Sequence, residues 1–168
     1  ACPEHGSCMD ELEPRMFSFN NPFGACPNCD GLGFLMKVDP SLVVPKPQLS
    51  VNEGAIRASG WYLSGGDNIA RMYFRALSEK YNFSLDTPFC ELSEKQQKIL
   101  LYGNNGEKLN MKRNSSFGSV AYNSSFEGVI PNLERRFKET NSEFIRREIE
   151  CVMSDCPCLE CNGKRLKK

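Results

Sequence analysis

Two short cysteine motifs, far apart in the sequence, constrain the fold of this chain more than any other feature. They occupy residues 26–29 and 158–161, and in each motif a glycine follows the second cysteine two positions later. One such motif offers a metal ion only two thiolates, so a closed tetrahedral zinc site needs both motifs. We therefore predict one Zn²⁺ site that clamps the intervening chain at its base, with four ligands: Cys26, Cys29, Cys158 and Cys161.

Two other interpretations of the motifs stay open on the sequence alone. They could be unrelated cysteine-rich turns, or one could be a redox motif of the thioredoxin type, which occurs singly between a strand and a helix. The repetition of the whole pattern, glycine included, favours zinc. Cys156 could replace Cys158 as a ligand, although its spacing to Cys161 is less suitable, and Cys90 and Cys151 are interpreted as ordinary thiols.

A further group with ligand-like spacing lies near the start of the sequence and consists of Cys2, His5 and Cys8. A tetrahedral site needs a fourth ligand, which is not obvious from the sequence. These residues are therefore either ligands of a second metal ion or plain turn residues.

The composition excludes several classes of protein. The 21 basic residues balance the 21 acidic ones, so bulk charge does not mark the chain as a polyanion binder. No run of about 18 apolar residues indicates a membrane span. Nine cysteines, an odd number partly arranged as metal motifs, argue against a secreted disulfide framework. We expect a reducing, cytoplasmic setting.

The spacing of apolar residues predicts a small mixed α+β domain with a β-hairpin or short sheet and about four helices. Helices are expected over residues 67–81 and 94–102, the second with a capping box of Ser93 and Gln96. Two more are expected in the last third, one starting near Pro131 and the next capped by Thr140 and Glu143, after which Pro157 ends the helical part.

Alternating apolar and polar residues predict the strands. A short strand is expected over residues 16–19, another at Val43 and Val44, and a hairpin over residues 109–122 with its loop at 114–118. No acidic residue lies between Lys108 and Glu127 in the sequence. The hairpin tip is therefore expected to be basic, with Lys112 and Arg113 near it.

A glycine-rich stretch at residues 63–67 is similar to the signature with which ABC ATPases contact nucleotide phosphate. The chain has no phosphate loop of the form Gly-x-x-x-x-Gly-Lys-Ser/Thr, so we interpret this stretch as a turn ahead of a helix. The sequence also lacks a catalytic triad pattern, and four closed cysteine ligands would leave no position for a catalytic water. We do not expect this chain to be an enzyme.

Three runs of sequence resemble the bacterial UvrA proteins, the damage-recognition ATPases of nucleotide excision repair. The runs are residues 11–33, 126–140 and 158–168, and they occur in the family's order. The resemblance implies an insertion domain carried on the first signature domain of the ATPase, with the cysteine motifs at its base. Residues 2–5 are Cys-Pro-Glu-His, where the family often has Cys-x-x-Cys, which puts the second metal group in doubt.

This resemblance also implies a division of the chain and a set of partners. Residues 1–36 would be a signature-domain segment with the first zinc motif, 37–130 the insertion domain, and 131–168 a helical return with the second motif. The implied partners are damaged double-stranded DNA, a second UvrA copy and UvrB.

Two functions follow from these observations. One is a DNA-contacting module of a repair ATPase, which binds phosphates without reading bases. The other is a zinc-clamped protein-interaction module that docks a partner subunit without contacting DNA, which the zero net charge favours slightly. For the first function, the expected DNA contacts are Arg71, Arg75, Lys112, Arg113, Arg135 and Arg136.

Overall fold

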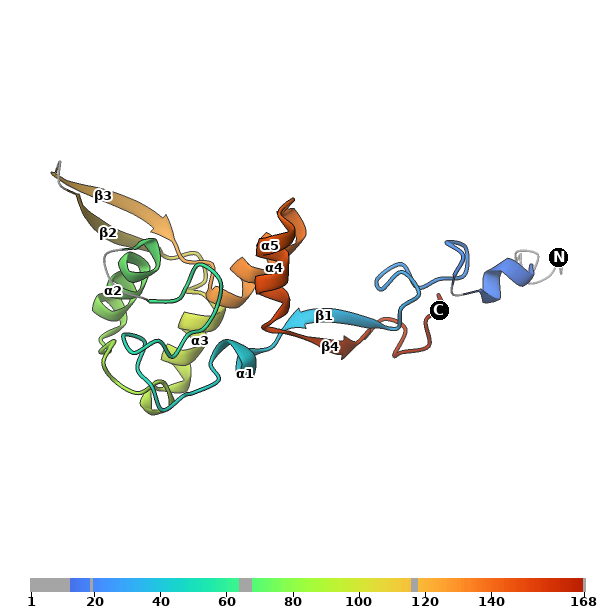
Figure 1. The fold of residues 1–168 in the computed structure, drawn as a ribbon, viewed down its shortest axis with the longest axis horizontal. Helices are drawn as coiled ribbons and strands as arrows, with labels where there is room; N and C mark the ends of the chain where they lie inside the picture. Colours follow the sequence, from blue (N-terminus) through green and yellow to red (C-terminus); the bar gives the residue numbers. More distant parts are fainter. Residues whose placement is uncertain (1–12, 19, 64–67, 116–117, 168) are drawn as a thin grey trace, which may run out of the picture. The chain divides into compact units, whose positions relative to one another are not determined.

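The computed structural model describes residues 13–18, 20–63, 68–115 and 118–167. The chain forms two compact units (Figure 1). One combines Ala1–Lys37 with Asp155–Lys168 and contains both cysteine motifs, and we call it the cysteine unit. The other is Val38–Ser154, which we call the central unit. None of the helices in the described ranges is long and apolar enough to cross a membrane.

In the described part of the cysteine unit the first element is a 3-10 helix, η1 (Pro14–Phe17), where we predicted a strand over residues 16–19. That prediction was wrong because Pro14 fixes the first helical residue, and the Met16 amide donates to the Glu13 carbonyl at 2.9 Å. An isolated bridge between Ala25 and Leu166 then joins the two ends of the unit. The cysteine motifs are thereby held together by backbone contacts as well as by their sulfurs.

Two strands that we did not predict, β1 (Phe34–Val38) and β4 (Met153–Pro157), pair in a two-stranded sheet. A four-residue helix, α1 (Pro40–Val43), follows β1 where we predicted a strand at Val43 and Val44. The helix forms because the Asp39 side chain accepts a hydrogen bond from the Ser41 amide at 2.9 Å and Pro40 occupies the first turn.

Helix α2 (Ile69–Tyr81) begins at Asn68, whose side chain accepts from the Arg71 amide, and buries Phe74 and Leu77. A short 3-10 helix, η2 (Phe89–Glu91), leads to α3 (Glu94–Tyr102). The capping box of Ser93 and Gln96 is present, so the predicted start of α3 is confirmed.

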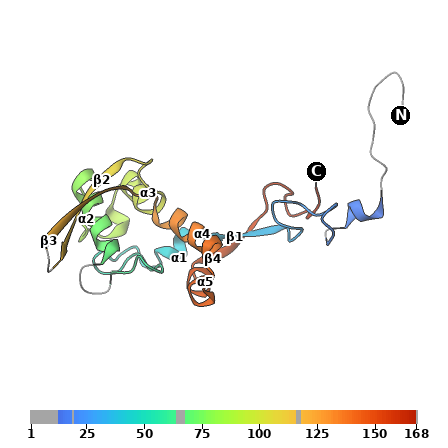
Figure 2. The same cartoon turned by 90° about the horizontal axis from the view of Figure 1, so that it is seen from above.

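The predicted hairpin is formed by β2 (Lys108–Ser115) and β3 (Gly118–Ser125), which pair antiparallel from Lys108 opposite Ser125 to Ser115 opposite Gly118. Its strands are longer than expected and include residues 114, 115 and 118, which we had assigned to the loop. Helix α2 packs beside β2, as Figures 1 and 2 show.

Two amphipathic helices complete the central unit: α4 (Val129–Glu139) and α5 (Glu143–Glu150). The prediction that Pro157 ends the helical part was wrong, because α5 ends at Glu150 and Pro157 lies in β4, which pairs with β1. The predicted capping box of Thr140 and Glu143 was wrong. Ser142 caps α5 by accepting from the Ile145 amide, whereas Thr140 ends α4 and its hydroxyl accepts from the Ser142 amide. Both helices belong to the same compact unit as the hairpin.

An aromatic cluster fixes the exit of the hairpin in the core of the central unit. The ring of buried Phe126 lies 5.5 Å from that of Trp61 and 5.7 Å from that of Tyr73, both centroid to centroid. Trp61 Nε1 donates to Asn132 on α4 at 3.0 Å. The residues that follow β3 are thus tied to α2, to α4 and to the loop around residue 60. The mixed helix and strand content confirms the predicted α+β class.

Candidate metal centre and nucleic-acid interface

The four predicted zinc ligands form one buried cluster. The sulfurs of Cys26 and Cys158 are 3.9 Å apart, and those of Cys29 and Cys161 are 3.8 Å apart. All four sulfurs lie within 4.8 Å of one another. Among the described residues, this is the group of His, Cys, Asp or Glu whose ligand atoms come together in this way.

Tight turns after each motif bring these sulfurs together. Gly31 and Gly33 follow the first motif, and Gly163 follows the second, all with positive φ. A side chain at Gly33 would meet the Gly163 carbonyl at 3.2 Å and Arg165 at 3.0 Å, so the close approach of the two turns needs glycine. The Gly33 amide also donates to the Cys29 sulfur at 3.2 Å.

Hydrogen bonding at Cys158 and burial at Cys29 shift the pKa values of these two thiols in opposite directions. The Cys161 backbone N–H lowers the pKa of Cys158 to about 6, against the effect of burial, and the Asn28 amide group assists at 3.4 Å. Burial raises the pKa of Cys29 to about 11, although the Gly33 N–H acts in the opposite direction. Metal binding at neutral pH would therefore release a proton from Cys29.

The distances fit a tetrahedral metal ion. With metal–sulfur bonds of about 2.3 Å, the sulfurs of a tetrahedral site lie about 3.8 Å apart. The Cys26–Cys158 and Cys29–Cys161 sulfur separations match that value, whereas a disulfide would need about 2.05 Å. Four buried ligands close the coordination sphere, so the cluster could hold a structural ion but offers no open position for catalysis.

The other cysteines lie outside this cluster. Cys158, and not the alternative Cys156, is the fourth cysteine of the cluster. Cys156 is half-buried on β4. Cys90 and Cys151 are exposed. The predicted second metal group of Cys2, His5 and Cys8 and the glycine-rich residues 64–67 lie outside the described residues.

Two of the predicted DNA contacts, Arg75 from α2 and Lys112 from β2, line the same hollow between these elements. Its volume is about 520 Å³, and Asn110 and Glu79 also line it. Arg71 is half-buried and donates to Asn52 at 3.3 Å. Arg113 is placed by its strand register opposite Val120. The hollow therefore joins one cation from each of two separate elements.

Arg135 and Arg136 have structural partners. The Arg135 guanidinium binds both oxygens of Glu127, at 3.2 and 2.8 Å, and also Glu139 at 2.8 Å. These bonds raise the pKa of Arg135, and the bond to Arg135 lowers the pKa of Glu127. Arg136 donates to the Ser59 carbonyl at 2.7 Å. Both arginines thus hold α4 to neighbouring segments.

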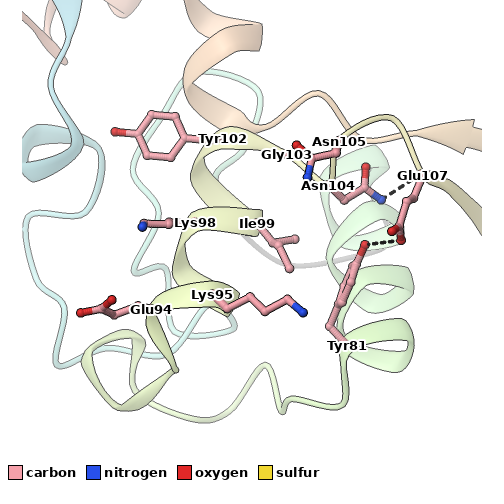
Figure 3. Close-up of a pocket in the computed structure, with 10 residues that line it drawn as sticks. All are labelled: Tyr81, Glu94, Lys95, Lys98, Ile99, Tyr102, Gly103, Asn104, Asn105 and Glu107. Atoms are coloured by element: carbon pink, nitrogen blue, oxygen red, sulfur yellow. Dashed lines mark hydrogen bonds between the residues drawn. The ribbon is translucent and has the colours of Figure 1, made fainter.

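A third group of basic residues was not among the predicted sites. Lys95 and Lys98 on α3 line a hollow of about 720 Å³ over Ile99 (Figure 3). Tyr81 donates to Glu107 there at 2.9 Å, and Lys80 pairs with the same carboxylate at 3.0 Å. Hydrogen bonds from Lys80 and Tyr81 lower the pKa of Glu107. The three-residue spacing of the lysines on α3 was the available sequence signal.

Comparisons of the sequence with known proteins lead to one family. Residues 39–151 match the family model of the UvrA DNA-binding domain. The UvrABC system protein A of Clostridium perfringens is 50% identical over 99% of this chain, which spans 18% of that relative. The protein of the same name from Methanothermobacter thermautotrophicus is 46% identical, with 99% of this chain and 17% of the relative covered.

The fold also matches a solved structure. The crystal structure of UvrA2 from Deinococcus radiodurans superposes with a TM-score of 0.69, covering 91% of this chain and 19% of that one at 24% sequence identity. This chain therefore spans less than a fifth of the length of these relatives.

Proposed function

Because this chain belongs to the UvrA family, we propose that it contributes to damage recognition in nucleotide excision repair by holding duplex DNA through its phosphates. The central unit would make the contact, and the cysteine unit would hold the two ends of the chain together around Zn²⁺. The parent protein would be the ATPase, acting with a second copy and with UvrB.

The hollow between α2 and β2 is the observation that carries this proposal. Arg75 and Lys112 line it from different elements, with Asn110 from β2 and the carboxylate of Glu79 from α2 also in its lining. Acidic residues are absent from the sequence between Lys108 and Glu127, so the hairpin keeps its positive charge. Cations and amides of this kind contact phosphate oxygens without reading sequence.

The arginines on α4 are less suitable for phosphates. Arg135 is held by two carboxylates, and its release to DNA would leave Glu127 and Glu139 beside the phosphates. Arg136 is used by the loop carbonyl of Ser59. We therefore assign the phosphate contacts to Arg75 and Lys112. Arg71 lies one helical turn before Arg75 on α2, and Arg113 is the next residue after Lys112 on β2.

Zinc is the metal proposed for the cysteine cluster. A set of four thiolates suits Zn²⁺ in preference to Mg²⁺ or Ca²⁺, which prefer oxygen ligands. The ion would stabilise the cysteine unit and take no part in ATP chemistry.

DNA binding by the full-length Lys112→Ala variant tests the proposal. We expect the variant to lose affinity equally for two duplexes of unrelated sequence, since phosphate contacts carry no sequence information. Lys46→Ala, which removes an equal charge from an exposed position in the loop after α1, is the matched control and should bind like the parent. Unchanged affinity of the Lys112→Ala variant, or a loss confined to one duplex, would refute the assignment.

A protein-docking role for the cysteine unit is the second candidate. Four of its large apolar side chains are more than half exposed: Phe17, Phe23, Leu32 and Leu159. Such a surface suits contact with another part of the protein or a partner subunit. If docking were the sole function, the full-length Lys112→Ala and Arg75→Ala variants would bind DNA as the parent does at every salt concentration.

A further inference from the structure

We infer that Tyr122 and Val120, on the outer part of the β2–β3 hairpin, form a stacking surface for unpaired DNA bases. This inference rests on the proposed function and deepens it. Phosphate contacts alone would hold any duplex, whereas a stacking surface would favour DNA that is locally opened.

The strand register places these side chains on one face. Tyr122 lies opposite Met111, and Ser124 lies opposite Leu109. Residues directly opposite in an antiparallel pair project to the same side of the sheet, and so do residues two apart on one strand. Val120, Tyr122, Met111 and Leu109 therefore share one face of the hairpin.

Burial changes sharply along that face. Leu109 and Met111 are 1% and 2% exposed, because they belong to the core of the central unit. Tyr122 and Val120 are 45% and 50% exposed. The apolar face that packs into the core at the base of the hairpin thus continues, uncovered, toward its tip.

Strand β3 also lacks the usual protection of an exposed sheet edge. Natural edges are commonly blocked by charged residues or proline. The strand from Gly118 to Ser125 contains neither, and nearly all of its residues are exposed. An uncharged strand with a half-exposed tyrosine suits a surface that is covered in the working state.

The charge of the hairpin favours nucleic acid as the covering partner. Residues 108–125 include three basic residues, Lys108, Lys112 and Arg113, and no acidic one. A second copy of the same hairpin would be repelled by this charge, whereas a nucleic-acid strand would be attracted. Arg113 pairs opposite Val120 in the strand register, whereas Lys108 and Lys112 belong to the other face of the hairpin. The charge of the hairpin would therefore attract the strand, and the ring of Tyr122 would stack its bases without regard to sequence, because every base offers a π face.

Binding of the full-length protein to two DNAs tests the inference. The first is a fully paired duplex, and the second is the same duplex with a short central bubble that carries 2-aminopurine. The ratio of the two affinities isolates base stacking from phosphate contacts. The variants are Tyr122→Ala, Tyr122→Phe, which keeps the ring, and Tyr102→Ala, which removes a half-exposed tyrosine from α3.

We expect the parent to prefer the bubble and to quench 2-aminopurine fluorescence on binding. Tyr122→Ala should lose affinity for the bubble by about 5- to 150-fold, the range seen for a lost base–aromatic stack, and should leave the fully paired duplex nearly unaffected. Tyr122→Phe and Tyr102→Ala should keep the preference and the quenching.

Two results would overturn the inference without touching the phosphate contacts. One is a parent that binds both DNAs equally, and the other is a Tyr122→Ala variant that weakens both by the same factor. If the parent binds neither DNA, the proposed function fails first. Sedimentation of Tyr122→Ala as a smaller species than the parent would instead assign this face to a second copy.

Discussion

At the scale of single residues, glycines decide where segments can approach each other. Gly128 has φ of +97°, and a β-carbon there would lie 2.4 Å from the Tyr102 carbonyl carbon and 2.5 Å from the Gly103 nitrogen. These are backbone atoms, which cannot rotate away. Gly128 therefore allows the start of α4 to contact the end of α3.

Replacing Gly128 by alanine is expected to destabilise the central unit by about 2 to 5 kcal/mol, from left-handed strain together with steric overlap. Gly106→Ala is the matched control, because Gly106 also has positive φ but has nothing within 4 Å of the added carbon. It should cost only about 1 to 2 kcal/mol. Denaturant unfolding measures both, and equal costs would show that the close approach is absent.

At the scale of elements, the sequence predicted best where the signal is local. The α3 cap depends on Ser93 and Gln96, which are three residues apart, and the hairpin depends on neighbouring alternating strands. At α5 the same reasoning failed because Thr140 and Ser142 are both good capping residues. The end of α4 decides which of the two caps α5: Thr140 is the C-cap of α4, so Ser142 is left as the N-cap of α5.

Strands β1 and β4 could not be predicted because their pairing joins distant parts of the chain and neither has a regular alternation of buried residues. That the four cysteines come together was predictable, since a tetrahedral thiolate site needs two motifs of this spacing. The sequence could not predict which cations line the same hollow, because only the packing of α2 on β2 brings Arg75 and Lys112 together there. The paired state of Arg135 likewise depends on Glu127, which lies in the preceding connection.

The ion pair between Glu127 and Arg135 joins the hairpin exit to α4, and its effect should depend on pH. The folded state lowers the pKa of Glu127 below its ordinary value of 4.5. The ion pair therefore stabilises the folded state fully above pH 4.5, and this stabilisation is lost as the pH falls through the lower pKa that Glu127 has in the folded state. Glu127→Gln should be less stable than the parent at pH 7, with a difference that shrinks at pH 3.

Thermal unfolding of both proteins across this pH range measures the effect. Glu91→Gln serves as a control, since Glu91 is exposed and lies on η2, a different segment from the Glu127–Arg135 pair. A difference between the parent and Glu127→Gln that stays constant from pH 7 to pH 3 would contradict the ion-pair explanation.

At the scale of the whole molecule, the two ends of the sequence form one unit around the cysteine cluster. Cys161→Ser should release the ion, because a tetrahedral site that loses one of four thiolates binds zinc much more weakly. Protease digestion should then cut both ends of the chain sooner than in the parent. Cys90→Ser, at an exposed cysteine outside the cluster, should keep the metal. One zinc per chain retained by Cys161→Ser would refute the ligand assignment.

If the hollow between α2 and β2 holds DNA phosphates, the affinity for DNA should depend on salt through the two cations that line it. The full-length parent should lose affinity linearly in log–log form as salt rises, through counterion release. The double variant Arg75→Ala and Lys112→Ala should reduce that slope by about 2 units, at about 0.9 unit per lost phosphate contact. Arg135→Ala should leave the slope unchanged. The opposite result, with the slope preserved in the double variant and reduced by Arg135→Ala, would place the DNA on α4 and contradict the account.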